Sequence, residues 1–463
     1  MEQTADDIPD TSAHPDADES DDAANIDDQD QQTRFPGGPT VTSLLTQYEH
    51  HVARRLWEGE DRGSLKVITH GLKLKKFAEV PIPAPVEHWI QESGLMHLSS
   101  GYLTMADAGL ISAFVERWHR ETSSFHLPFG EMTITLDDVA TLLHISPHGK
   151  FFDAPLNMNT NNAVRAAHEY LGATWEEACA EISYNKFGCT IFADKTHTRV
   201  EAKYITLFID LHRCRDYSWA SATLVFLYDN LEIELSTTLD SWECWIYEHF
   251  PRICKRGDRG AVPAHLPRAC RWTAKHAVEG GLMAYRQRLD GLLLEDVVFT
   301  PYDDDRANHP FVSVSMFSGY LRCGGVSIPY LPERCLRQFG RIQCIPRDVP
   351  PMSDSIDWVW QSTMRSSVET FRRLYPVATF SGEVTADYDA WYISVSHPLI
   401  LPPSTVAPSS PHTTVAAHAG PSSYAHAGRD RRAAELAHRA LDMVRPFSEI
   451  HEILSELCRL YDD

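Results

Sequence analysis

The sequence predicts a mostly α-helical protein, of the α+β type with a few short β-hairpins, built as one large domain with a tail at each end. Apolar residues recur at helical spacing along much of the middle of the chain, which is the primary signal for helices. Strand-like runs are few and short. No long low-complexity segment interrupts residues 35–402, so we expect these residues to form a single domain.

The N-terminal segment, residues 1–34, is predicted to be a disordered acidic tail. Residues 1–32 hold twelve Asp or Glu and no Lys or Arg, which is more than half of the chain's net charge of −22. A segment with this charge and no aromatic side chain cannot bury enough apolar surface to fold. Its first residues, MEQTADDIPD, are acidic where a signal peptide would be basic and apolar.

Cysteine usage and hydropathy indicate the compartment. The ten cysteines are scattered singly and no CxxC pair occurs, which is typical of reduced thiols in the cytosol or nucleus. No apolar run approaches the roughly 18–20 residues that span a bilayer. We therefore expect no membrane segment and no disulfide framework.

Two helical patterns come with caps. In the first, Leu110, Phe114 and Trp118 fall on one stripe, and Thr104 is placed to cap the helix. In the second, Thr174 and Glu177 have the spacing of a capping box.

Other segments indicate the core and the strands. Residues 217–235 and 241–250 are apolar nearly all round and are predicted to lie in the core. Strand signals occur around Pro128 and in residues 297–302.

The stretch FHLPFGEMTITLDDVATLLHI, residues 125–145, holds carboxylates among apolar residues and raises the question of an active site. Two strand-like runs flank the turn PFG, and a helix-like run follows. Thr135 is placed to cap that helix, with Asp138 at its third position and Asp137 beside it, where negative charge is favourable. We therefore assign these carboxylates a structural role.

Five stretches in order resemble the plant mobile domain family: ERWHRETSSFHLPFGEMTITLDDVATLL (116–143), YSWASATLVFLY (217–228), FTPYDDD (299–305), CLRQFGRIQCIP (335–346) and DYDAWYISVSHP (387–398). The resemblance covers roughly residues 85–400. It implies a plant nuclear protein, of a family spread partly with transposable elements, that acts in transposon silencing, gene expression and meristem maintenance. It also implies a partner of the long-form plant serine/threonine phosphatase type, which some members are fused to or work with.

The chain departs from the family pattern after the capped helix. His144-Ile145-Ser146 stand where the family usually has Gly-Leu-Pro. A glycine there would serve as a left-handed helix stop, so the substitution questions the geometry of the turn.

Enzymatic interpretations find little support. The family also carries the label aminotransferase-like, but no lysine lies in a glycine-rich turn after a strand pattern, as pyridoxal chemistry would need. A metallophosphoesterase pattern appears as DLH (210–212), GDRG (257–260) and NH (308–309), but it lacks the second carboxylate and the β-α-β context. Cys244, Cys254, His265 and Cys270 are not spaced as a zinc finger. The sequence therefore predicts no enzyme, no cofactor, and no catalytic or metal-binding residue.

A basic loop, residues 252–275, contrasts with the acidic chain, because it holds seven Lys or Arg and one Asp. It is either a solvated loop or a surface for nucleic-acid phosphates or an acidic protein, with Trp272 placed to stack on a base. The candidate binding residues are Arg252, Lys255, Arg256, Arg259, Arg268, Arg271, Trp272 and Lys275.

The C-terminal part is predicted to comprise a Pro/Ser/Ala-rich linker, residues 403–428, and an amphipathic helical segment, residues 429–463. Pro446 interrupts the heptad pattern. The stronger half is too short to be stable alone and must dock either on the domain or on a second chain. Its candidate partner-binding residues are Phe447, Ile450, Leu454 and Leu457.

Together these observations predict a non-enzymatic nuclear interaction or scaffold protein. The alternative is a nucleic-acid-binding module of transposable-element origin that uses the basic loop.

Overall fold

The computed structural model describes residues 37–65, 81–82, 84–96, 107–153, 159–183, 205–206, 210–232, 242–274, 280–364 and 367–402. All of them belong to one compact unit, Phe35–Thr413. The predictions for residues 1–34, 403–428 and 429–463 lie outside the described residues, and so do those for the C-terminal partner-binding residues.

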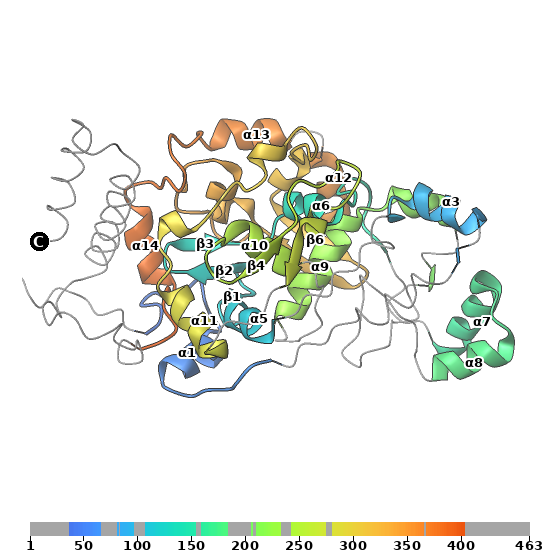
Figure 1. Cartoon of the computed structure of the whole chain (residues 1–463), viewed down its shortest axis with the longest axis horizontal. Helices are drawn as coiled ribbons and strands as arrows, with labels where there is room; N and C mark the ends of the chain where they lie inside the picture. Colours follow the sequence, from blue (N-terminus) through green and yellow to red (C-terminus); the bar gives the residue numbers. More distant parts are fainter. Residues whose placement is uncertain are drawn as a thin grey trace, which may run out of the picture. The chain divides into compact units, whose positions relative to one another are not determined.

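Helices dominate the described part of the chain (Figure 1). The α-helices are α1 (Val52–Trp57), α3 (Ala84–Ser93), α5 (Ala108–Val115), α6 (Leu136–Leu143), α7 (Thr160–Leu171), α8 (Trp175–Ser183), α9 (Trp219–Glu232), α10 (Trp242–His249), α11 (Gly281–Asp290), α12 (Ile356–Thr363), α13 (Ser367–Leu374) and α14 (Tyr388–Val395). Short 3-10 helices occur at η1 (Tyr48–His50), η3 (Leu211–Asp216), η4 (Arg268–Arg271), η5 (Leu294–Asp296), η6 (Asp303–Asp305), η7 (Ser313–Met316), η8 (Pro332–Arg334) and η9 (Leu336–Phe339).

The strands are short and pair antiparallel. They are β1 (Trp118–His119), β2 (Ser124–Leu127), β3 (Gly130–Met132), β4 (Arg256–Asp258), β5 (Trp272–Ala274), β6 (Gly319–Cys323) and β7 (Val326–Tyr330). They form a three-stranded sheet β1-β2-β3 and two hairpins, β4-β5 and β6-β7. The predicted mostly helical character with short antiparallel strand pairs is thus confirmed.

The main core surrounds the three-stranded sheet. Phe125 of β2 faces Trp118 across the β1 pairing and Met132 across the β3 pairing. Phe114 of α5 meets the Phe125 ring edge to face, with 5.8 Å between ring centroids. Trp245 of α10 stacks on the same ring at 5.4 Å, so the two helices clamp one face of the sheet.

Several local predictions are confirmed. Thr135 and Asp138 form a capping box at the start of α6. Thr174 and Glu177 make the reciprocal hydrogen bonds of a second capping box at α8. His144 itself adopts the left-handed conformation, with φ 55°, so the helix stop that a glycine would supply is kept.

Other local predictions are wrong. The cap of α5 is Asp107, which accepts from the amides of Gly109 and Leu110, because the helix begins later than the pattern suggested. Trp118 lies in β1, beyond the end of that helix. Residues 297–302 form no strand and follow η5 as turn and coil. None of the helices in the described ranges has the length and apolar character required to cross a bilayer.

Candidate functional site

The carboxylates of the hairpin region are buried and fully engaged. Glu131 is 1% exposed, and its two oxygens accept from Nη2 and Nε of Arg334 at 2.6 and 2.7 Å. Ser124 Oγ donates to the same carboxylate at 2.6 Å. Burial acts to raise the pKa of Glu131, but the Arg334 guanidinium, His126 and Ser124 together outweigh it, and the net pKa lies below its usual value.

Asp138 accepts three hydrogen bonds and also contacts a histidine. Its Oδ2 accepts from the amide and hydroxyl of Thr135, both at 2.7 Å, and its Oδ1 accepts from Tyr302 at 2.9 Å. His249 Nε2 lies 3.1 Å from Oδ1. Burial acts to raise the pKa of Asp138, but His249 and Thr135 hold it below the usual value.

Asp137 is also bonded to partners on other elements, although its burial raises its pKa above the usual value. It forms an ion pair with Arg306 at 2.9 Å and accepts from the Val312 amide at 2.9 Å. The hydrogen bonds and ion pairs of Glu131, Asp137 and Asp138 link separate elements of the fold. The hollow beside Asp138 and His249 has a volume of about 10 Å³, which is room for about one water.

The basic loop lies on the β4-β5 hairpin and is more internally paired than its composition suggests. Arg268 is 3% exposed and binds both oxygens of Glu248, at 2.9 and 3.1 Å. Trp272 is 4% exposed and donates to Glu248 at 2.8 Å. The guanidinium groups of Arg256 and Arg271 each lie over its ring, 4.8 Å from the centroid. Contrary to the sequence-based expectation, Trp272 offers no exposed ring to a base, because the hairpin folds it onto Glu248.

The remaining cations of the loop differ in their surroundings. Arg252 pairs with Asp296 at 2.8 Å and Arg271 with Asp258 at 2.7 Å. The side chains of Lys255 and Arg259 are exposed. Lys275 lies outside the described residues. The hypothesis of a binding loop therefore rests on Lys255 and Arg259, and it stays a prediction.

The residues of the phosphoesterase-like pattern are engaged at separate places. His212 lies 3.0 Å from Glu92, while Asp210 accepts from the His212 amide at the start of η3. Asp258 is paired with Arg271, and His309 lies 3.7 Å from Asp305. The described cysteines form no disulfide with one another, and Cys244 Sγ faces the Ala269 carbonyl at 3.9 Å.

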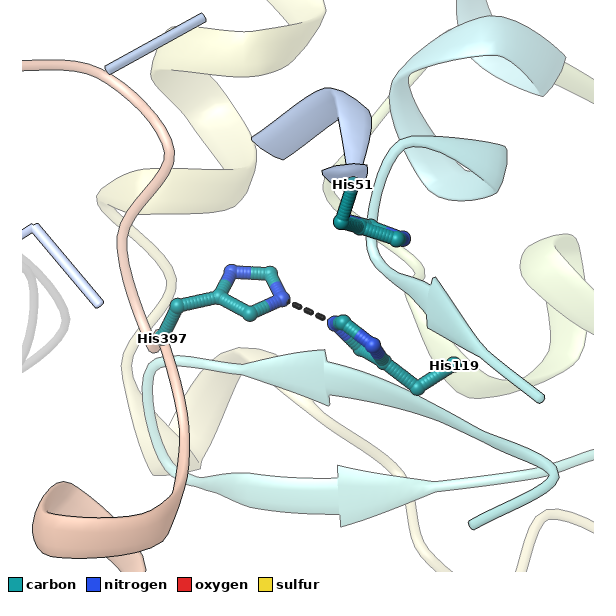
Figure 2. Close-up of side chains that lie close together, drawn as sticks. All are labelled: His51, His119 and His397. Carbon is teal, nitrogen blue, oxygen red and sulfur yellow. Dashed lines mark hydrogen bonds between the residues drawn. The ribbon is translucent and has the colours of Figure 1, made fainter. Parts of the chain in front are cut away.

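A cluster of histidines, which sequence analysis missed, lies beside the three-stranded sheet (Figure 2). His51 caps α1, His119 ends β1, and His397 follows α14. Their candidate ligand atoms all lie within 4.8 Å of one another, and within the described ranges this is the single group with such spacing. Each histidine is far from the others in sequence, so no local motif reveals the cluster.

The rings of this histidine cluster are close-packed. His51 and His119 stack with 4.0 Å between ring centroids, and Nε2 of His119 is hydrogen-bonded to Nε2 of His397. Burial lowers the pKa of His51 to about 4 and places the pKa of His119 and His397 well below their usual value. All three imidazoles are therefore neutral at pH 7.

The comparisons with known proteins place the chain in a family. Residues 94–186 and 184–393 match the family described as Plant mobile domain, so the chain belongs to that family, as its sequence blocks predicted. The match covers more than half of the chain and includes the sheet, the capped helix α6 and the hairpins.

Three relatives come from Arabidopsis thaliana. Protein MAIN-LIKE 2 is 26% identical over 78% of this chain, and the chain spans 62% of that protein's length. Protein MAINTENANCE OF MERISTEMS is 27% identical, with 66% of this chain and 72% of the relative covered. A serine/threonine-protein phosphatase 7 long form homolog is 28% identical, with 67% of this chain and 27% of the relative covered. No solved structure matches the chain significantly.

Proposed function

We propose that this plant mobile domain protein is a non-enzymatic interaction or scaffold protein of the nucleus, acting in transposon silencing, gene expression and meristem or genome maintenance. Its proposed partner is a protein of the long-form serine/threonine phosphatase type. The relative named as a serine/threonine-protein phosphatase 7 long form homolog matches 67% of this chain. This match supports the choice of partner.

The observation that carries the proposal is an apolar ridge, defined as residues 374–380 at the end of α13 and in the turn after it. Leu374, Val377 and Phe380 are 51%, 64% and 61% exposed. Large apolar side chains gathered on a surface mark interaction sites in soluble proteins. Such a ridge suits a protein partner, because its exposed side chains offer apolar contact area.

The ridge is held in place by the backbone around it. The Ile342 amide donates to the Pro376 carbonyl at 3.1 Å, and the Ala378 amide donates to Gly340 at 3.0 Å. A surface whose conformation is fixed before binding loses less conformational entropy when a partner binds. The ridge therefore has the two properties expected of a docking surface, exposure and rigidity.

The proposal is tested by affinity purification of the full chain from plant nuclei, with and without nuclease. We expect a phosphatase-type partner to be recovered in both cases. Val377→Asp with Phe380→Asp should abolish this recovery, because two carboxylates cannot be buried in an apolar interface without a cation.

A matched control carries the same two new charges elsewhere. Val41 and Ile82 are exposed apolar residues outside the ridge, 46% and 43% exposed, so Val41→Asp with Ile82→Asp should leave recovery unchanged. Recovery of chromatin alone, lost on nuclease treatment, would contradict the scaffold proposal and favour the nucleic-acid-binding alternative.

A further inference from the structure

The histidine cluster of His51, His119 and His397 has features of a metal-binding site that its role in packing does not explain. Two imidazole nitrogens, Nε2 of His119 and Nε2 of His397, face each other directly, as Figure 2 shows. In the hydrogen bond between them, one ring is the donor and the other is the acceptor. With both rings in the tautomer that carries the proton on Nδ1, a cation could instead accept a lone pair from each Nε2.

A hydrogen bond to the opposite ring nitrogen orients His51, and a carboxylate lies near the opposite nitrogen of His119. His51 Nε2 lies 2.9 Å from the Trp118 carbonyl and donates to it, which leaves Nδ1 with the lone pair. His119 Nδ1 lies 3.9 Å from a carboxylate oxygen of Glu121. A carbonyl or carboxylate behind the imidazole is the usual surrounding of metal-binding histidines, since it fixes the tautomer and the ring.

The third ring has one nitrogen toward the cluster and one away from it (Figure 2). His397 is fully buried, and its Nδ1 has no hydrogen-bond partner in the described part of the chain. Nδ1 lies on the far side of the ring, so the candidate ligand atom is Nε2. With Nδ1 protonated, His397 Nε2 presents its lone pair to the cluster.

The neighbouring polar side chains are engaged elsewhere. His126 contacts Ser396 Oγ at 2.7 Å through Nδ1 and Thr122 Oγ1 at 3.1 Å through Nε2. The Tyr48 hydroxyl donates to the Gly37 carbonyl at 2.6 Å. Three imidazoles are therefore the protein's ligand set, which leaves a further position for water, as in sites with three protein ligands.

We propose that His51, His119 and His397 bind one divalent transition-metal ion, with Zn²⁺ as the expected metal. The ligands come from the start of α1, from β1 and from the segment after α14, so the ion would fasten these parts of the domain together. This site departs from the sequence-based prediction of no metal ligand, and it does not depend on the proposed scaffold function. Binding requires His51 Nδ1 to release the Ala53 amide, a contact at the long distance of 3.2 Å.

The test uses the full chain, stripped of metal with a chelator and titrated with Co²⁺, whose visible absorption reports nitrogen ligation. We expect one Co²⁺ per chain, displaced by Zn²⁺, and a higher melting temperature with either ion, because a ligand that binds only the folded state stabilises it. His51→Asn should weaken binding by roughly 10–100-fold or more. The asparagine oxygen can still cap α1, so the fold is retained.

The matched control is His50→Asn, which removes the neighbouring exposed histidine and leaves the cluster intact. It should bind Co²⁺ as the unmodified chain does. A stripped chain that takes up no stoichiometric Co²⁺ or Zn²⁺, or a folded His51→Asn variant with unchanged affinity, would overturn the proposal.

Discussion

The buried carboxylates of the hairpin region and the buried histidines beside them differ in what each side chain faces. Glu131 faces a guanidinium and a hydroxyl, and Asp138 faces hydroxyls, an amide and an imidazole. In the histidine cluster, by contrast, His119 and His397 face each other through the same kind of nitrogen. Complementary partners make the buried carboxylates part of the fold, whereas the facing nitrogens of His119 and His397 are the basis of the proposed metal site.

Breaking the complementary region should give the largest effect. Arg334→Met leaves the Glu131 carboxylate buried without its cation, and we expect a loss of about 3–5 kcal/mol in the free energy of unfolding. Denaturant unfolding of the full chain measures it. The double variant Arg334→Met with Glu131→Leu should recover most of the loss, because it removes both charges. A single variant as stable as the unmodified chain would contradict this assignment.

The next effect concerns the cap of α6. Loss of a helix cap alone costs about 0.5–2 kcal/mol, but Asp138 also accepts from Tyr302 and contacts His249. Asp138→Ala should therefore cost about 2–4 kcal/mol, since buried donors lose their acceptor. Glu177→Ala removes the same kind of cap at an exposed position of α8 and should cost clearly less. Equal losses in denaturant unfolding would show that the buried contacts add nothing.

The sequence predicts contacts between near neighbours, but it does not predict contacts between distant residues. The Thr135–Asp138 cap joins residues three apart, so side-chain chemistry and helix geometry suffice to predict it. The β2-β3 pairing around Pro128 is equally local. Glu131 and Arg334 are 203 residues apart, and only the fold brings them together.

The misplaced and missed residues have the same cause. The composition of the basic loop indicates charge, but it cannot show that the β4-β5 hairpin buries Trp272 against Glu248. The histidine cluster has no motif, because its three residues lie at the ends of three separate elements. Two of them, His119 and His397, lie in stretches that carry the family resemblance. That shared location was the one sequence feature that could have pointed to these two residues.

Glu243 differs from both Glu131 and Asp138, because it is a buried carboxylate without a cationic hydrogen-bond partner among the described residues. It accepts from the Asp107 amide at 2.7 Å and from Tyr247 at 3.2 Å. Burial raises its pKa from 4.5 to about 7, and the charge of Asp107 acts in the same direction. The folded chain therefore holds this proton more tightly than the unfolded chain.

Protonated Glu243 contributes to the stability of the folded chain. This contribution is fully present below about pH 4.5 and is lost as the pH rises through about 7. Glu243→Gln should match the unmodified chain at about pH 4 or below, and it should be more stable by about 1–3 kcal/mol at pH 8. Denaturant unfolding at both pH values measures the difference. Parallel stability curves would show that Glu243 titrates normally.

The smallest effect is expected where charges are exposed and solvated. Lys255 and Arg259 are the exposed cations on which the binding-loop hypothesis rests. Lys255→Ala with Arg259→Ala should change the free energy of unfolding by less than about 0.5 kcal/mol, because neither side chain is buried. Arg213→Ala with Arg215→Ala removes two exposed positive charges on η3 and serves as the control.

The same variants separate the two functional hypotheses. If the scaffold proposal holds, both double variants recover the protein partner as the unmodified chain does, because the apolar ridge is untouched. A nucleic-acid-binding loop would instead show an affinity that falls steeply with salt, and removing two phosphate contacts would lower the slope of log affinity against log salt by about 2. A smaller slope in the Lys255 and Arg259 variant, and not in the control, would contradict the scaffold proposal. It would favour the nucleic-acid-binding alternative.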